Sequence, residues 1–294
     1  MGKITDFHCG YDNSIGLTKK IAARTDLTFP AAYEKAETMA ILSKALKEEE
    51  GAEFCQLPFC HTVEGEALGG MINLGDENIG PRAKEYRCTT PEEILALPEI
   101  DYSMGRIAEV LKACKILRDA GEDVVLYVSG PFTILNVLME PRYVFKTFKK
   151  KPDMMQRIFD KLQREILRFI EEAQRAGVQL ISYGDSSGGL NILGPKFSED
   201  TLEMFTYPLL KNLEKLLNSE TNSETLILLC PKTTFALLGM EKARWKDLDL
   251  GAPMKYGEGC VKAIGRATFA GQMCINNKNY ELQNGVLKTV ELLP

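Results

Sequence analysis

Several familiar sequence signals are missing from this chain of 294 residues. It has no run of 18 apolar residues, so no membrane-spanning helix is expected. Its first ten residues, MGKITDFHCG, lack the apolar core of a secretory signal. The eight cysteines have no disulfide-scaffold spacing, so they are expected to be reduced thiols in a cytoplasmic protein.

Histidine is scarce, and the signatures of several common enzyme classes are absent. Only His8 and His61 occur, and no GxSxG motif supports a serine hydrolase. Neither GxGxxG nor GxxxxGK[ST] is present, so no nucleotide-binding fingerprint exists. The net charge of −5, from 36 basic and 41 acidic residues, gives no electrostatic basis for nucleic-acid binding.

The composition is that of an ordinary globular protein, with 45% apolar and 26% charged residues. No internal repeat and no linker rich in proline, serine or glycine divides the chain. We therefore treat residues 1–294 as a single domain.

Apolar patterns of helical and strand type alternate along the chain. Helices are predicted at 31–50, 60–70, 104–120, 152–176, 198–218 and 234–245. Strands are predicted at 71–74, 122–130, 178–185, 226–230, 245–250, 267–274 and 289–293. This alternation favours a parallel sheet, in either a (β/α)₈ barrel or a doubly wound fold.

Short polar or glycine-rich loops follow four of the predicted strands. They begin at Ser129, Gly184, Cys230 and Gly271. Active sites of both candidate folds lie at the carboxyl ends of the strands. These loops are therefore where chemistry is expected.

Asp185 is the best-placed carboxylate, directly after an apolar strand. It disfavours phosphate binding by the glycine-rich segment 184–189, and residues 191–196 are expected to form a loop before the next helix. Two interpretations of Asp185 stay open. It either caps a turn or serves as an acid, base or acceptor in a pocket.

The segment 60–66 gathers Cys60, His61, Glu64 and Glu66 within seven residues. On a helix, Cys60 and Glu64 would share one face. The segment is either a helix start with solvated carboxylates or part of a site.

Cys230 and Cys274 each follow an apolar run at a predicted strand end. Thiolates from two strands of a barrel could bind one Zn²⁺, although no CxxC motif is present. The alternative is that both are buried core thiols.

Taken together, these segments resemble the uroporphyrinogen decarboxylase superfamily, and within it the corrinoid-dependent methyltransferase branch. The similarity runs from about residue 53 to residue 274. The matching stretches are 66–70 (EALGG), 80–81 (GP), 90–94 (TPEEI), 97–98 (LP), 129–133 (SGPFT), 184–188 (GDSSG), 193–196 (LGPK) and 229–232 (LCPK).

The resemblance implies a (β/α)₈ TIM barrel, either closed or abbreviated at its C-terminal end. It argues against a true decarboxylase. The family's Arg-Gln-Ala-Gly-Arg segment is absent, and Cys60 stands where its catalytic aspartate is expected.

The methyltransferase branch holds zinc through a His-x-Cys pair and a further cysteine downstream. Cys230 matches the cysteine of that pair and Cys274 the downstream one, but Leu228 occupies the histidine position. Cys60, His61 or Glu64 would have to supply a third ligand.

The resemblance therefore predicts a zinc- and corrinoid-dependent methyltransferase acting with a corrinoid protein and a small methyl acceptor or donor. Asp185 is expected to be catalytic, and substrate contacts are expected from Cys60, His61, Glu64, Ser129 and Ser186. The alternatives are a carboxy-lyase or a binding barrel that has lost its zinc.

Overall fold

The computed structural model describes residues 4, 7, 19–219, 224–277 and 279–294. The helices are α1 (Lys19–Thr25), η1 (Ala31–Tyr33), α2 (Ala36–Glu50), α3 (Val63–Ala67), α4 (Pro91–Ala96), α5 (Gly105–Asp119), α6 (Pro131–Leu138), α7 (Pro141–Lys150), α8 (Pro152–Arg175), α9 (Leu190–Thr201), η2 (Leu202–Thr206), α10 (Tyr207–Ser219), α11 (Pro231–Gly239) and α12 (Tyr256–Lys262). Among these described helices, none is both long and apolar enough to cross a membrane.

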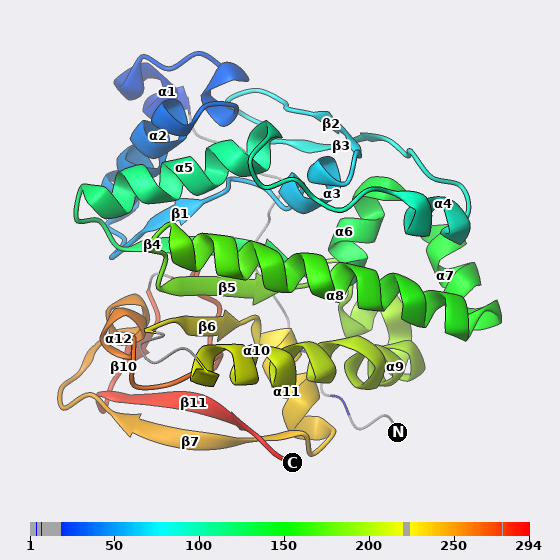
Figure 1. Cartoon of the computed structure of the whole chain (residues 1–294). Helices are drawn as coiled ribbons and strands as arrows, with labels where there is room; N and C mark the ends of the chain where they lie inside the picture. Colours follow the sequence, from blue (N-terminus) through cyan, green and yellow to red (C-terminus); the bar gives the residue numbers. More distant parts are fainter. Residues whose placement is uncertain (1–3, 5–6, 8–18, 220–223, 278) are drawn as a thin grey trace.

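The strands are β1 (Cys55–Leu57), β2 (Met71–Asn73), β3 (Arg82–Glu85), β4 (Val124–Ser129), β5 (Leu180–Gly184), β6 (Leu226–Leu229), β7 (Ala243–Asp249), β8 (Met254–Lys255), β9 (Phe269–Ala270), β10 (Glu281–Leu282) and β11 (Val286–Leu292). Seven of them form the central sheet, in the order β1-β4-β5-β6-β9-β11-β7 (Figure 1). The first five are parallel, whereas β11 runs antiparallel to both β9 and β7.

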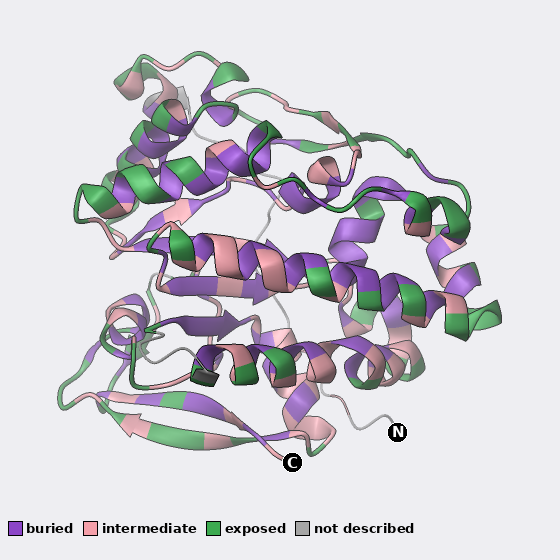
Figure 2. Ribbon diagram, viewed as in Figure 1, coloured by how far each residue is buried: buried purple, intermediate pink, exposed green. Residues whose placement is uncertain are grey.

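The parallel strands are buried on both faces, which explains their nearly continuous apolar sequences. In β5 and β6 the alternate residues Ile181, Tyr183 and Ile227 join the large cluster packed under the helices. Leu180 and Leu228 join a second cluster on the opposite, inner face. In Figure 2 these strands are purple, while the outer sides of the covering helices are green.

The longest helix, α8, matches its predicted span to within one residue and lies across the sheet beside α5 and α10 (Figure 1). Pro152 opens its first turn, where a missing N–H costs no hydrogen bond. Gly177 ends it with φ 84°, a conformation that suits glycine. The predicted apolar stripe, including Phe159, Leu162 and Ile166, is fully buried.

The predicted α/β class with a parallel barrel-type sheet is confirmed. Within the described residues, no strand pairing joins β1 and β7, which lie at the two ends of the strand order. The expectation that 245–250 and 289–293 continue a parallel sheet is wrong, because β7 and β11 form an antiparallel pair. Charged residues such as Lys246 and Asp247 leave β7 largely exposed, so it could not be a doubly buried parallel strand.

Two predicted loop and helix boundaries are also wrong. Residues 191–196 are not a loop, because α9 begins directly after Gly189 and continues through a kink at Gly194, where φ is 71°. The helix predicted at 234–245 is α11, which Pro231 starts earlier, and the chain enters β7 at Ala243.

Replacing Ile166 in the buried stripe of α8 by alanine should lower the free energy of unfolding by about 2–5 kcal/mol, because a cavity replaces packed methyl groups. Urea denaturation measures the change. The matched control is Ile116→Ala, since Ile116 of α5 is 38% exposed and its truncation should cost less than about 1 kcal/mol. Equal losses for the two variants would contradict the packing described.

Candidate functional site at the carboxyl edge of the sheet

The carboxyl ends of the adjacent strands β4, β5 and β6 lie at one edge of the sheet. Ser129 pairs with Gly184 in the β4–β5 register, and the Gly130 N–H donates to the Gly184 carbonyl at 2.8 Å. One strand further, the Cys230 N–H donates to the Tyr183 carbonyl at 2.9 Å. The predicted residues Ser129, Asp185 and Cys230 are therefore close together on consecutive strand ends.

Asp185 holds the first turn of α6. Its Oδ1 accepts hydrogen bonds from the Thr133 N–H at 2.8 Å and the Thr133 hydroxyl at 2.7 Å. Its Oδ2 accepts from the Phe132 N–H at 3.1 Å. A carboxylate at a helix N-terminus satisfies donors that have no partner within the helix. Of the two interpretations, the structure shows the capping contact, made to a helix distant in sequence.

Glycines make the close approach of Asp185 possible. A Cβ on Gly130 would come within 2.4 Å of the Asp185 Cβ. A Cβ on Gly188 would come within 2.3 Å of the Asp185 Oδ2. Neither position therefore accommodates a side chain. Burial raises the pKa of Asp185, and its hydrogen bonds to Thr133 and Phe132 oppose that rise.

Ser186 lies on the same loop and is exposed. Its hydroxyl is 3.2 Å from that of Thr133, which also accepts from the Ser187 N–H at 3.2 Å. The loop after β5 is thus attached to α6 by both Asp185 and Thr133.

Glu64 is a buried carboxylate, 3% exposed, at the carboxyl end of β4. Its Oε1 accepts a hydrogen bond from the Ser129 N–H at 2.6 Å. Ser129 is itself only 1% exposed. Burial raises the pKa of Glu64, although the Ser129 hydrogen bond and the Arg106 charge lower it. The two predicted site residues, Glu64 and Ser129, are therefore in contact in the protein interior.

The helix predicted at 60–70 is shorter, spanning only Val63–Ala67. Cys60 and Glu64 therefore do not share a helical face, and their side chains have different partners. The Cys60 Sγ accepts from the Arg106 guanidinium at 3.2 Å and lies 3.3 Å from the Thr62 hydroxyl. Cys60, where the resemblance expects an aspartate, thus lies against a cation.

Arg106 is a residue of this region that the sequence analysis did not identify. It is 8% exposed and donates to Glu66 Oε2 at 2.7 Å and to Thr62 Oγ1 at 2.8 Å. Burial opposes its charge, but Cys60 and Glu66 raise the pKa of the guanidinium. A sequence signal existed, since Arg106 lies one turn before Val110 on the apolar stripe of α5.

His61 approaches the inner face of the sheet. Its ring meets that of Tyr127 edge-on, with centroids 6.0 Å apart. The Tyr127 hydroxyl donates to Asn276 Oδ1, from the loop after β9. Burial lowers the pKa of His61, so its imidazole is neutral near pH 7.

Cys230 and Cys274 are both half-buried and follow the adjacent strands β6 and β9. Leu228 belongs to the inner-face cluster, and Cys230 follows directly after the end of β6, as the N-cap of α11. Within the described ranges, no group of three His, Cys, Asp or Glu residues could hold a metal ion. Leu228 is 2% exposed and offers no ligand. His8 lies outside the described residues.

With the geometry established, comparison with known proteins places the fold in the α/β barrel class. A solved structure of a methyltransferase from Methanosarcina mazei superposes with a TM-score of 0.62 at 24% identity, covering 78% of this chain and 66% of that one. Residues 16–248 match the family model described as uroporphyrinogen decarboxylase (URO-D), so the chain belongs to that family. The family that the sequence resemblance predicts is thereby confirmed.

The curated relatives carry more specific names. The chain is 28% identical to "Methylcobamide:CoM methyltransferase MtaA" of Methanosarcina barkeri, over 83% of this chain and 71% of that protein. It is 24% identical to "Methylcobamide:CoM methyltransferase MtbA" of Methanosarcina mazei, over 73% of this chain and 62% of that protein. The similarity thus covers most of this chain. The matched region spans 71% of the first of these methyltransferases and 62% of the second.

Glu64 should make the stability of the protein depend on pH. Its pKa in the folded state is raised above the ordinary 4.5, so the folded protein binds more protons than the unfolded chain between the two pKa values. The free energy of unfolding therefore falls as pH rises from about 4.5 through the folded pKa. Glu64→Gln keeps an acceptor for Ser129 and should flatten this part of the curve.

Urea denaturation at several pH values measures both curves. The difference between the two stability curves gives the contribution of Glu64 alone. Asp185 and Glu165 also have raised pKa values, but they contribute equally to both proteins. Parallel curves for the two proteins would show that Glu64 is not the buried acid described.

Proposed function

We propose that this protein is a corrinoid-dependent methyltransferase. It moves a methyl group between a methylated corrinoid, carried by a separate corrinoid protein, and a small thiol. The observation that carries this proposal is the similarity, over 83% and 73% of the chain, to two relatives named as methylcobamide:CoM methyltransferases. Coenzyme M is accordingly the first thiol to test.

The reaction balances without an added oxidant or reductant. The methyl group forms a bond to the sulfur of the thiol while its bond to cobalt breaks. Both electrons of the broken bond stay on the corrinoid, and the thiol proton goes to a base. A thiolate is the nucleophilic form, so a group that accepts this proton speeds the transfer.

His61 is the best candidate for that base among the predicted residues. It is neutral near pH 7, because burial lowers its pKa, and its ring lies beside Tyr127 at the inner face. Asp185 instead has its two oxygens hydrogen-bonded to α6, and Glu64 is bonded to Ser129. We assign these two carboxylates to positioning the loops around the substrates.

Zinc does not fit the described residues as a three-ligand site. Cys230 and Cys274 supply two sulfurs at neighbouring strand ends, but the position where a third ligand is expected holds Leu228. The other proposed ligands have different contacts, since Cys60 lies against Arg106 and Glu64 against Ser129. The His61 ring lies edge-on to Tyr127. No step of the proposed reaction passes through zinc.

A second candidate function follows from Leu228. A barrel of this family with a leucine in place of a metal-ligating histidine could bind a corrinoid protein or a thiol without transferring the methyl group. The two functions differ in a direct assay.

Mixing the purified protein with methylcobalamin and coenzyme M should convert the methylated corrinoid to its demethylated form, seen as a change in its visible spectrum. The rate should be proportional to the protein concentration. Homocysteine, 2-mercaptoethanol and cysteine serve as alternative acceptors. No spectral change with any thiol, at protein concentrations that saturate corrinoid binding, would favour the binding barrel and contradict transfer.

Replacing His61 by glutamine should lower the turnover number about 10²-fold, because a positioned general base contributes roughly that factor or more. The rate of the wild type should rise with pH through a pKa below 6.5, the ordinary value for histidine, and the variant should lose this dependence. Unchanged pH profiles in the two proteins would exclude His61 as the base. Circular dichroism and the melting temperature check that the variant is folded.

A further inference from the structure

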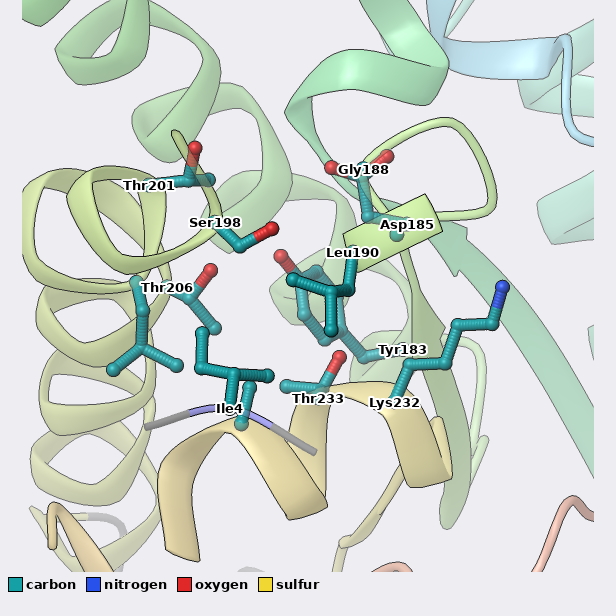
Figure 3. A pocket seen from close by; sticks show the side chains of 13 residues that line it. Ile4, Tyr183, Asp185, Gly188, Leu190, Ser198, Thr201, Thr206, Lys232 and Thr233 are labelled. Atoms are coloured by element: carbon teal, nitrogen blue, oxygen red, sulfur yellow. The ribbon is translucent and has the colours of Figure 1, made fainter. Parts of the chain in front are cut away.

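A small cavity lies next to the loop that follows β5, between the outer side of β5 and the helices α9 and α11 (Figure 3). Asp185 and Gly188 of that loop are among its lining residues. Its volume is about 50 Å³. Tyr183 of β5, Ser198 of α9, Leu202 of η2 and Thr233 of α11 line it, and Ile4 forms part of its wall. Because Tyr183 projects from the outer face of the sheet, the cavity is separate from the inner face that holds Tyr127 and Leu228.

Two buried hydroxyl groups point into this cavity. The Tyr183 hydroxyl and the Ser198 hydroxyl have no hydrogen-bond partner among the described residues. Tyr183 is 1% exposed and Ser198 is 9% exposed. Figure 3 shows the two oxygens directed toward each other from opposite walls. Buried hydroxyls without a partner are costly, so native proteins usually satisfy them.

The lining determines the kind of ligand that fits. Ile4, Leu202 and Ala236 are apolar, and Thr206 and Thr233 bring further hydroxyls. The charged atoms are directed elsewhere. In Figure 3 the Lys232 amine and the Asp185 oxygens point away from the two hydroxyls, and the Asp185 oxygens are bonded to α6.

A charged ligand would therefore remain unpaired inside the cavity, which is unfavourable. A neutral ligand with hydroxyl groups can both donate to and accept from Tyr183 and Ser198. Since one water needs roughly 10–15 Å³ of such space, the volume suits about three to five water molecules or one short polyol.

We propose that this cavity is a binding site for a small neutral hydroxylic ligand, held between the hydroxyl groups of Tyr183 and Ser198. The ligand is either a cluster of ordered water or a short polyol. This proposal does not depend on the methyltransferase function.

The sign of a melting-temperature change tests the proposal. If a ligand bridges the hydroxyls, Tyr183→Phe and Ser198→Ala each remove a hydrogen bond, and the melting temperature should fall by about 2 °C. If the hydroxyls are dry, removing either one relieves an unsatisfied group, and the melting temperature should rise. A rise for both variants would overturn the proposal.

A tyrosine with a known partner provides the matched control. The Tyr102 hydroxyl donates to the Glu165 carbonyl at 2.6 Å, so Tyr102→Phe should lower the melting temperature. The proposal requires Tyr183→Phe to change in the same direction as this control.

A second experiment distinguishes the two sources of hydroxyl groups. Glycerol and ethylene glycol are titrated into the wild type and the Tyr183→Phe/Ser198→Ala double variant, and the melting temperature is followed. A saturable gain present only in the wild type identifies a polyol site. Equal gains, together with electron density bridging the two hydroxyls in crystals grown without polyol, identify water. Equal gains with no density there would overturn the proposal.

Discussion

Burial of the parallel strands on both faces is the constraint on which the rest of the molecule depends. Strands such as β5 and β6 pack against helices on one side and against an apolar inner cluster on the other, so they leave almost no side chain for chemistry along their length. Polar groups are concentrated instead at the carboxyl edge. There the half-buried carboxylate of Asp185 and the buried carboxylate of Glu64 join strand ends to α6 and α3. Arg106 joins α5 to Cys60 and Glu66.

These polar contacts explain how loops that are far apart in sequence form one edge. Thr133 and Asp185 are separated by 52 residues but share two hydrogen bonds. Hydrogen bonds to a charged acceptor in a buried place are stronger than those at the surface, and removing one partner leaves the other unsatisfied. The glycines at 130 and 188 belong to the same arrangement, because a Cβ at either position would collide with the carboxylate.

Elements with a strong periodic pattern could be predicted from the sequence. The β-branched run at β4 correctly predicts a strand, and the apolar stripe at α8 correctly predicts a helix. The loops at Ser129, Asp185 and Cys230 follow three strands that are adjacent in the sheet, as predicted. The direction of β7 and β11 could not be predicted, since local pattern does not encode which strand a segment pairs with. The helical state of residues 191–196 is not predictable from the local sequence, because Gly194 and Pro195 usually break a helix, whereas here they only kink it.

The hydrogen-bond partners of the site residues were harder to predict than the places of these residues in the fold. Sequence analysis found Cys60, Glu64 and Asp185 as notable residues, but their partners Arg106, Ser129 and Thr133 are 46, 65 and 52 residues away. Such pairings depend on tertiary packing. Leu228 shows the opposite case, since the sequence alone places a leucine where the resemblance expects a histidine. Among the described residues, no group of three His, Cys, Asp or Glu side chains could hold a metal ion.

The most direct test of methyl transfer follows the methyl carbon itself. The protein is incubated with ¹³C-methyl-labelled methylcobalamin and coenzyme M, and the products are examined by carbon NMR. The proposed function predicts that the label moves from cobalt to sulfur and appears as a methyl thioether, in an amount that exceeds the protein. Label that stays on cobalt, while the protein binds the corrinoid, would contradict it.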